Sequence, residues 1–246
     1  LDEGNRIGNI INIYDRENEL IRPAVSNISQ ALVVFAIANP MPNLNLLDRF
    51  LVMMERNEID TIICFNKIDL VDEEEILKLR DIYVKAGYHV MFTSTKENMG
   101  IEEVLRVIDG KTTAFAGPSG VGKSSLLNAL IPEANSQTGE ISEKIKRGKH
   151  TTRHTEIFNV SDDTYLMDTP GFSSLYVNDF EKEELKNYFR EFIEYNNGCR
   201  FTGCVHVNEP DCLVKEAVEN GGINRSRYDN YILMYEEIKN KKSTWR

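Results

Sequence analysis

The chain is 246 residues long, which is enough for one large α/β domain or for a medium domain with smaller attachments. Apolar residues make up 41% of the chain and charged residues 28%, so the composition is that of a folded protein rather than a disordered one. Asp and Glu number 39 against 29 Lys and Arg. The resulting net charge of −10 argues against a protein that coats nucleic acid through general positive charge.

The sequence contains neither a membrane span nor a secretory signal that we can detect. Its longest apolar run, residues 31–38, has 8 residues, whereas a membrane-spanning helix needs roughly 20. The first residues carry mixed charge and no apolar core. We therefore expect a cytoplasmic protein with no membrane partner, acting as a monomer. With four cysteines and no export signal, we expect a reducing compartment, where clustered cysteines bind metal more often than they form disulfides.

Strand-like and helical patterns alternate along most of the chain. Residues 8–14 and 19–22 flank a polar turn and predict either a short β-hairpin or the tail of a β domain. Further strands are expected over 31–38, 61–66, 88–93, 112–116 and 163–167, and helices over 44–57, 73–86, 101–108, 181–195 and 225–241. This alternation predicts an α/β fold in which helices cover both faces of a mainly parallel sheet, and a smaller C-terminal module begins around Leu175.

A phosphate-binding loop follows the strand at residues 112–116. Residues 117–124 read GPSGVGKS, which matches the pattern G-x-x-x-x-G-K-S/T between a strand and a helix. Glycines allow backbone N–H groups to surround phosphate oxygens, and the following helix adds its positive N-terminus. We expect Lys123 to reach the β and γ phosphates and Ser124 to bind Mg²⁺, so the chain is predicted to bind a nucleoside triphosphate.

A second motif indicates which base is bound. Residues 66–69 read NKID at the end of a strand, and the carboxylate of Asp69 can accept hydrogen bonds from the N1–H and the exocyclic amine of guanine. Adenine has no such pair of donors, so the motif favours GTP over ATP. Residues 93–95 follow the next strand, where their backbone N–H groups could bind the guanine carbonyl oxygen. An ordinary turn and an ordinary helix cap are the alternatives for these two segments.

Two segments downstream of the phosphate loop fit the γ-phosphate side of the site. Residues 168–171 read DTPG after a strand, which lets Asp168 hold the water shell of Mg²⁺ and the Gly171 N–H sense the γ-phosphate. Residues 144–155 are rich in threonine, glycine and positive charge, and Thr152 or its neighbour Thr151 is a candidate Mg²⁺ ligand. A flexible polar loop would have the same composition.

The predicted sites use these residues. The GTP-binding set is Asn66, Lys67, Asp69, Thr93, Ser94, Gly117, Pro118, Ser119, Gly120, Val121, Gly122, Lys123, Ser124, Ser125, Asp168 and Gly171. The magnesium set is Ser124, Thr152 and Asp168. The guanine motif precedes the phosphate loop, whereas in the usual GTPase order the phosphate loop comes first. The chain is therefore similar to a circularly permuted GTPase, and its pocket is preserved because termini lie at the surface of such domains.

Three thiols and one imidazole lie within 14 residues near the C-terminus: Cys199, Cys204, His206 and Cys212. Four ligands of these types fill the tetrahedral shell of Zn²⁺ and leave no position for an activated water. We expect one structural zinc ion that stabilises a module too small to hold itself together. Core cysteines with an unrelated histidine are the alternative, and Cys64 is expected to be such a core residue.

The motif order, the string GKHTT at 148–152, DTPGFS at 168–173 and the cysteine spacing together resemble the small ribosomal subunit biogenesis GTPases, the RsgA family of the YjeQ/YloQ type. The resemblance covers essentially the whole chain. It implies an N-terminal OB-fold, of which residues 1–28 are the last part, a permuted GTPase domain at 29–175 and a zinc-binding helical domain at 176–246. It also implies action on the 30S subunit and contact with 16S rRNA, and most of the OB-fold is expected to be missing.

The position after D-x-x-G bears on the mechanism. Many GTPases carry a water-orienting glutamine there, but this chain has Phe172, which cannot hydrogen-bond to water. We therefore expect slow intrinsic hydrolysis. Our hypothesis is that docking on the 30S subunit orders residues 144–155 and brings His150 to the attacking water and Thr152 to Mg²⁺, beside the catalytic Lys123. A histidine that only packs against RNA is the alternative.

Local positive charge fits an RNA partner. Residues 141–155 hold five Lys or Arg and one acid, and the C-terminus adds Lys239, Lys241, Lys242 and Arg246. Exposed loops have the same composition for solubility alone. Other functions left open are a permuted GTPase that acts on the 50S subunit or another RNA, and a nucleotide-sensing, RNA-binding zinc module with little catalysis.

Overall fold

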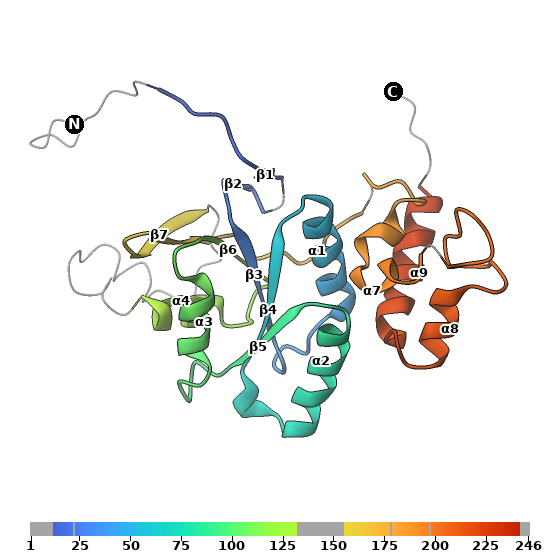
Figure 1. Ribbon diagram of the computed structural model, residues 1–246. Coiled ribbons are helices and arrows are strands. Elements are labelled where there is room, and N and C mark those ends of the chain that lie inside the picture. Colours follow the sequence, from blue (N-terminus) through green and yellow to red (C-terminus); the bar gives the residue numbers. More distant parts are fainter. Residues whose placement is uncertain (1–11, 22, 132–154, 178, 197, 242–246) are drawn as a thin grey trace, which may run out of the picture.

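A computed structural model of the chain describes residues 12–21, 23–131, 155–177, 179–196 and 198–241 (Figure 1). The strands are β1 Glu19–Leu20, β2 Val25–Ser26, β3 Gln30–Ala36, β4 Asp60–Asn66, β5 His89–Thr93, β6 Thr112–Ala116, β7 Glu156–Ser161 and β8 Thr164–Asp168. The helices are α1 Leu44–Arg56, α2 Glu73–Lys85, α3 Ile101–Ile108, α4 Lys123–Leu130, α7 Arg190–Ile193, α8 Leu213–Glu219 and α9 Arg225–Lys239, with 3₁₀ turns η1 Ile68–Leu70 and η2 Leu185–Tyr188.

Six strands form one sheet in the order β5-β4-β3-β6-β8-β7. The first five pair in parallel, and β7 pairs antiparallel with β8 at the edge. The central strand β3 is buried at every residue, as a parallel strand covered on both faces should be. The carboxyl ends of β3, β4, β5, β6 and β8 therefore meet at one edge, where sheets of this kind bind ligands.

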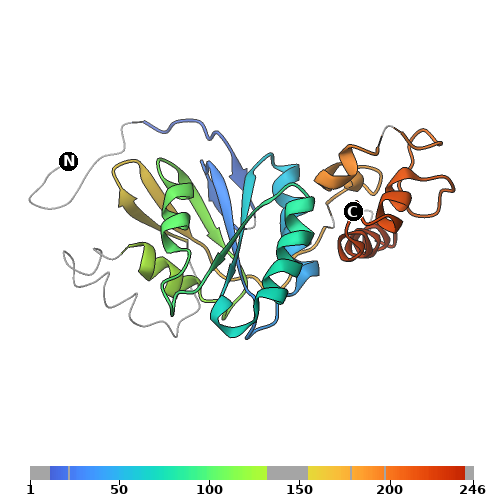
Figure 2. The ribbon, with the colours of Figure 1, turned by 60° about the horizontal axis from the view of Figure 1, so that its bottom comes forward.

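Helices cover both faces of the sheet (Figures 1 and 2), which confirms the predicted α/β architecture. Val33 and Phe35 of β3 pack into a core with α1 and α2. The alternate residues Leu32 and Val34 pack into a second core with α3 and α4. The side-chain alternation of a strand thus feeds two hydrophobic layers from one segment.

The N-terminal hairpin was predicted with the wrong partner strand. β1 pairs with β2, so the turn lies around Pro23 and not at residues 15–18. The Asn18 side chain holds the residues that flank this hairpin together: its Oδ1 accepts from the Ile28 N–H at 3.0 Å and its Nδ2 donates to the Ile28 carbonyl at 2.8 Å. Residues 12–18 form no strand, and residues 8–11 lie outside the described part of the chain.

Two further differences concern single elements. Strand β7 was not predicted, because its residues alternate between partly buried and exposed positions and contain few apolar residues in a row. The helix expected over residues 181–195 is broken into η2 and α7 by Phe189, whose backbone is extended. The Phe189 ring is fully buried and packs edge-on against Tyr231 at 5.2 Å, so tertiary packing outweighs helix propensity there.

The C-terminal module forms a hydrophobic core that also takes in Val52 of α1, and it lies beside α1, on the side of the sheet away from α3 and α4 (Figure 2). A fully buried arginine joins the two parts. Arg227 of α9 donates to Asp48 of α1 at 2.6 Å and to both carboxylate oxygens of Glu191 at 2.7 and 2.9 Å. Its guanidinium also lies 4.9 Å from the ring centroid of Phe189. Buried charges of this kind are stable only as a pair, because water cannot solvate either charge once its partner is removed.

The Arg227→Ala substitution is expected to destabilise the protein by about 3–5 kcal/mol, since it leaves two buried carboxylates without their counter-charge. The control is Arg200→Ala, which breaks an ion pair with Asp211 whose side chains are 67% and 60% exposed. That change should cost about 0–1 kcal/mol. Chemical denaturation of both variants measures the difference. Equal losses of unfolding free energy would contradict a structural role for the buried pair.

Candidate functional site

The phosphate loop begins directly after the buried strand β6, and two of its glycines are required by close contacts. A Cβ on Gly117 would lie 2.1 Å from the Val34 carbonyl oxygen of β3. A Cβ on Gly122, which has φ +94°, would lie 2.4 Å from Nδ2 of Asn66. Only glycine allows the loop to approach both neighbouring strands this closely. The loop therefore lies at the carboxyl edge of the sheet and leads into the N-terminus of α4.

Lys123 and Gly171 meet inside this loop. The Lys123 ammonium donates to the carbonyl oxygens of Gly117 at 2.7 Å and Pro118 at 2.9 Å. Burial lowers the pKa of Lys123, and the nearby carboxylate of Asp168 opposes that shift. The Cβ position of Gly171 lies 3.3 Å from Lys123 Nζ and 3.3 Å from the backbone nitrogen of Ser119. The D-x-x-G segment thus faces the phosphate loop, as the sequence predicts.

Asn66 ties the guanine motif to the phosphate loop. Its side chain is fully buried, donates from Nδ2 to the Val121 carbonyl at 3.1 Å and accepts from the Thr93 hydroxyl at 3.1 Å. Lys67 has a left-handed backbone and donates to the carbonyls of Gly120, at 2.8 Å, and Asn39. Three segments far apart in sequence are therefore joined by side chains of one motif.

Asp69 is held in place by Ser94. The Ser94 hydroxyl donates to its carboxylate at 2.6 Å, and Lys96 lies 3.7 Å away. These contacts, the Ser94 hydrogen bond above all, hold the pKa of Asp69 below its ordinary value, so the carboxylate stays ionised as an acceptor at neutral pH. The Ser94 N–H donates to Met99. Thr93 and Ser94 thus orient Asn66 and Asp69 through their side chains, a role that the spacing of the motifs did not predict.

The remaining predicted residues divide into two groups. Ser124 and Ser125 are exposed on the first turn of α4, and Asp168 is buried at the end of β8. His150 and Thr152, with Thr151 and the rest of residues 144–154, lie outside the described part of the chain. The structure therefore brings together the phosphate loop, the guanine motif and the D-x-x-G segment.

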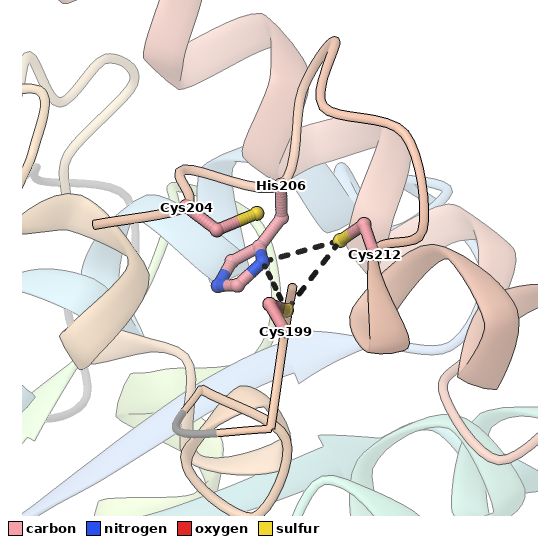
Figure 3. A group of neighbouring side chains, drawn as sticks. All are labelled: Cys199, Cys204, His206 and Cys212. Atoms are coloured by element: carbon pink, nitrogen blue, oxygen red, sulfur yellow. Dashed lines mark hydrogen bonds between the residues drawn. The ribbon is translucent and has the colours of Figure 1, made fainter. Parts of the chain in front are cut away.

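The four predicted metal ligands gather in the C-terminal module (Figure 3). The ligand atoms of Cys199, Cys204, His206 and Cys212 all lie within 4.8 Å of one another. His206 Nδ1 is 3.3 Å from Cys212 Sγ and 3.6 Å from Cys199 Sγ, and those two sulfurs are 3.9 Å apart. A tetrahedral zinc ion with ordinary bond lengths separates its ligand atoms by roughly 3.5–3.8 Å. The cluster fits such an ion.

Neighbouring groups prepare the histidine and its loop for a metal. Asn196 Oδ1 accepts a hydrogen bond from His206 Nε2 at 2.8 Å, which leaves Nδ1 unprotonated toward the thiols. Burial lowers the pKa of His206 to about 4 and raises that of Cys204 to about 12. A metal would therefore meet a neutral imidazole and displace protons from the thiols. The Tyr228 hydroxyl fixes the loop by donating to the His206 carbonyl at 2.7 Å.

Known proteins match almost the whole chain. The sequence profile of the RsgA GTPase family matches residues 13–178. The chain is 59% identical over 241 residues to the small ribosomal subunit biogenesis GTPase RsgA of Agathobacter rectalis, covering 98% of this chain and 80% of that protein. It is 50% identical over 238 residues to the protein of the same name from Alkaliphilus metalliredigens, covering 97% and 82%.

Two solved structures share the fold. YjeQ from Thermotoga maritima superposes with a TM-score of 0.77 at 42% identity and covers 94% of this chain and 78% of its own. YloQ, described as a circularly permuted GTPase, superposes with a TM-score of 0.76 at 38% identity and covers 95% and 76%. Sequence profile, near full-length identity and fold agree, so this chain belongs to the RsgA GTPase family.

Proposed function

We propose that the chain hydrolyses GTP as a maturation factor of the 30S ribosomal subunit, and that docking on the subunit stimulates hydrolysis. The observation that carries this proposal is the 59% identity, over 98% of the chain, to a protein named for small ribosomal subunit biogenesis. A shared fold alone would not define the partner. The meeting of the guanine motif, the phosphate loop and residues 168–171 at one edge supports the GTPase chemistry.

The side chains at this edge have different roles in phosphoryl transfer. Asp69 selects guanine, Lys123 neutralises charge on the β and γ phosphates, and the Gly171 N–H faces the γ-phosphate. Ser124 and Asp168 are the described residues that would hold Mg²⁺, which offsets phosphate charge when it is bound with GTP. The remaining predicted GTP-binding residues of the loop, from Gly117 to Ser125, supply backbone N–H groups and the start of α4.

Phe172 explains why a partner is needed. Its ring stacks on Phe50 at 5.4 Å between centroids and cannot orient water. We assign that task to His150, and a Mg²⁺ contact to Thr152, in the complex with the subunit. Because catalysis is completed only on the subunit, GTP is hydrolysed at the assembly step that it controls.

The domain limits and the zinc ion belong to the same proposal. We place the end of an OB-fold at residues 1–28, the GTPase domain at 29–175 and the zinc module at 176–246. The last division is supported by a hydrophobic core whose buried residues, apart from Val52 of α1, all lie from Val177 onward. The metal is Zn²⁺, since three thiols and one imidazole suit it best. Within the parts of the chain that the structure describes, no helix has the length and apolar character to traverse a bilayer. We propose action as a monomer in the cytoplasm, with 16S rRNA as the contact surface.

Ribosomal subunits should change the rate of turnover. GTP hydrolysis by the chain should rise about tenfold or more with 30S subunits, and not with 50S subunits or with ATP in place of GTP. In the His150→Ala variant, GTP should still bind while the 30S-stimulated rate falls about 100-fold. Phosphate release measured under these conditions tests both statements.

Each alternative has its own outcome in that assay. Stimulation by 50S subunits would assign the chain to the large subunit, and GTP binding without turnover on any subunit would leave a nucleotide-sensing RNA-binding module. Stimulated turnover that is unchanged in His150→Ala would remove His150 from the mechanism.

The zinc site should depend on the residue that orients its histidine. The Asn196→Ala variant should bind Zn²⁺ about 10–100-fold more weakly, because His206 loses the partner that fixes its protonated nitrogen. The control is Asn187→Ala, an exposed amide of η2 in the same module. Competition with a chromophoric chelator measures both affinities. Equal affinity in the two variants would show that Asn196 does not orient the ligand.

A further inference from the structure

The segment that faces the phosphate loop also packs against α1. Gly171 lies against Lys123 and Ser119, and the next residue, Phe172, stacks nearly parallel on Phe50 with an interplanar angle of 6°. Phe50 is fully buried in the middle of α1. A shift of the Gly171 backbone toward a γ-phosphate must therefore break this stack or move α1 with it.

The same segment contacts α1 a second time, three residues further on. The carbonyl oxygen of Leu175 accepts a hydrogen bond from Arg49 at 3.3 Å, and Leu175 itself is buried in the core under α1. The other end of the Arg49 guanidinium donates to Glu237 of α9 at 2.5 Å. We refer to residues 168–172 as the switch segment, and Leu175 lies on its continuation. One side chain of α1 thus contacts both this continuation and a helix of the C-terminal module.

The third contact is the buried ion pair with the module. Asp48 accepts from Arg227 at 2.6 Å and, through its other oxygen, from Asn230 at 2.6 Å. Its side chain and that of Arg227 are each 1% exposed. Such a pair does not slide gradually, because any partial separation leaves a charge buried without a partner. The module must move with α1 or detach from it.

Three consecutive residues of one helix therefore contact the switch segment, its continuation and the module. We propose that α1 couples the nucleotide state sensed at residues 168–171 to the docking of the C-terminal module, with Phe50 as the positioning residue for the switch segment. Phe50 acts through Phe172 and contacts no reacting atom. The inference rests on the proposed placement of the γ-phosphate beside Gly171.

Coupling of this kind is reciprocal. If GTP and GDP favour different docked states of the module, then weakening the docking must change the relative affinity for the two nucleotides. A purely structural contact would lower stability and leave that ratio alone. The ratio of the two dissociation constants is therefore the property to measure, because the chain of contacts from Gly171 to Arg227 is physically continuous.

The experiment is a double-mutant cycle with Phe50→Leu and Arg227→Lys in the full chain. Both changes keep the class of the side chain, apolar at residue 50 and cationic at residue 227, although lysine cannot reproduce the forked contacts of Arg227. Thermal unfolding checks that each variant is folded. Affinities for GDP and for a non-hydrolysable GTP analogue are measured with Mg²⁺ present. Each single variant should change the ratio of the two affinities by about fivefold or more, which is within the usual range of allosteric coupling. The double variant should change the ratio no further, since one break already interrupts the path.

Tyr83→Phe is the matched control. It removes a 3.1 Å hydrogen bond to the same Asp48 carboxylate, but from α2 within the GTPase domain. Its affinity ratio should stay within about twofold of the parent. Unchanged ratios in both single variants, or a double variant whose effect is the product of the two, would overturn the coupling. If the parent binds neither nucleotide, both this inference and the proposed GTP site are overturned, so the two failures are distinguishable.

Discussion

The hydrogen bonds of Asn66 are the constraint on which the nucleotide edge depends. One amide side chain, buried at the end of β4, donates to the phosphate loop and accepts from Thr93 at the end of β5. The loop can approach Asn66 only because residue 122 is a glycine. A buried amide must satisfy both of its ends, so the guanine side and the phosphate side of the edge are fixed relative to each other.

These hydrogen bonds do not depend on the order of the segments along the chain. A permuted sequence can therefore build the same nucleotide-binding edge of the sheet as a GTPase with the usual motif order. Asn66 precedes Val121 in sequence, yet β3 lies between β4 and β6 and brings both loops to the same end of the sheet. Permutation gives the switch segment a different continuation. Here residues 172–177 lead directly into the core of the C-terminal module. Helix α1 contributes residues to this core and to the core on its own face of the sheet. The permuted connections therefore place the module directly after the segment that faces the phosphate loop.

The binding motifs and their chemistry could be predicted from the sequence, but the contacts between residues far apart in the chain could not. The phosphate loop, the guanine motif and the four metal ligands carry residue types at spacings that their chemistry demands, so each could be recognised before the fold was known. Phe189 breaks a helix because its ring is needed in a core formed by residues far away in sequence. Asp48 and Arg227 lie 179 positions apart, and nothing local marks either as buried. Asn196, which orients His206, is one of many asparagines. Its role is evident only from its 2.8 Å contact.

The central claim is that the carboxyl edge of this sheet is a guanine-specific nucleotide site, and calorimetric titration with GDP, ADP and xanthosine diphosphate tests it most directly. The parent chain should bind GDP about 100-fold or more tightly than the other two, because Asp69 accepts from both guanine donors. The Asp69→Asn variant should prefer xanthosine diphosphate, whose base presents a carbonyl where guanine has its amine. Equal affinity of the parent for GDP and ADP, or undiminished GDP binding by Asp69→Asn, would contradict the account.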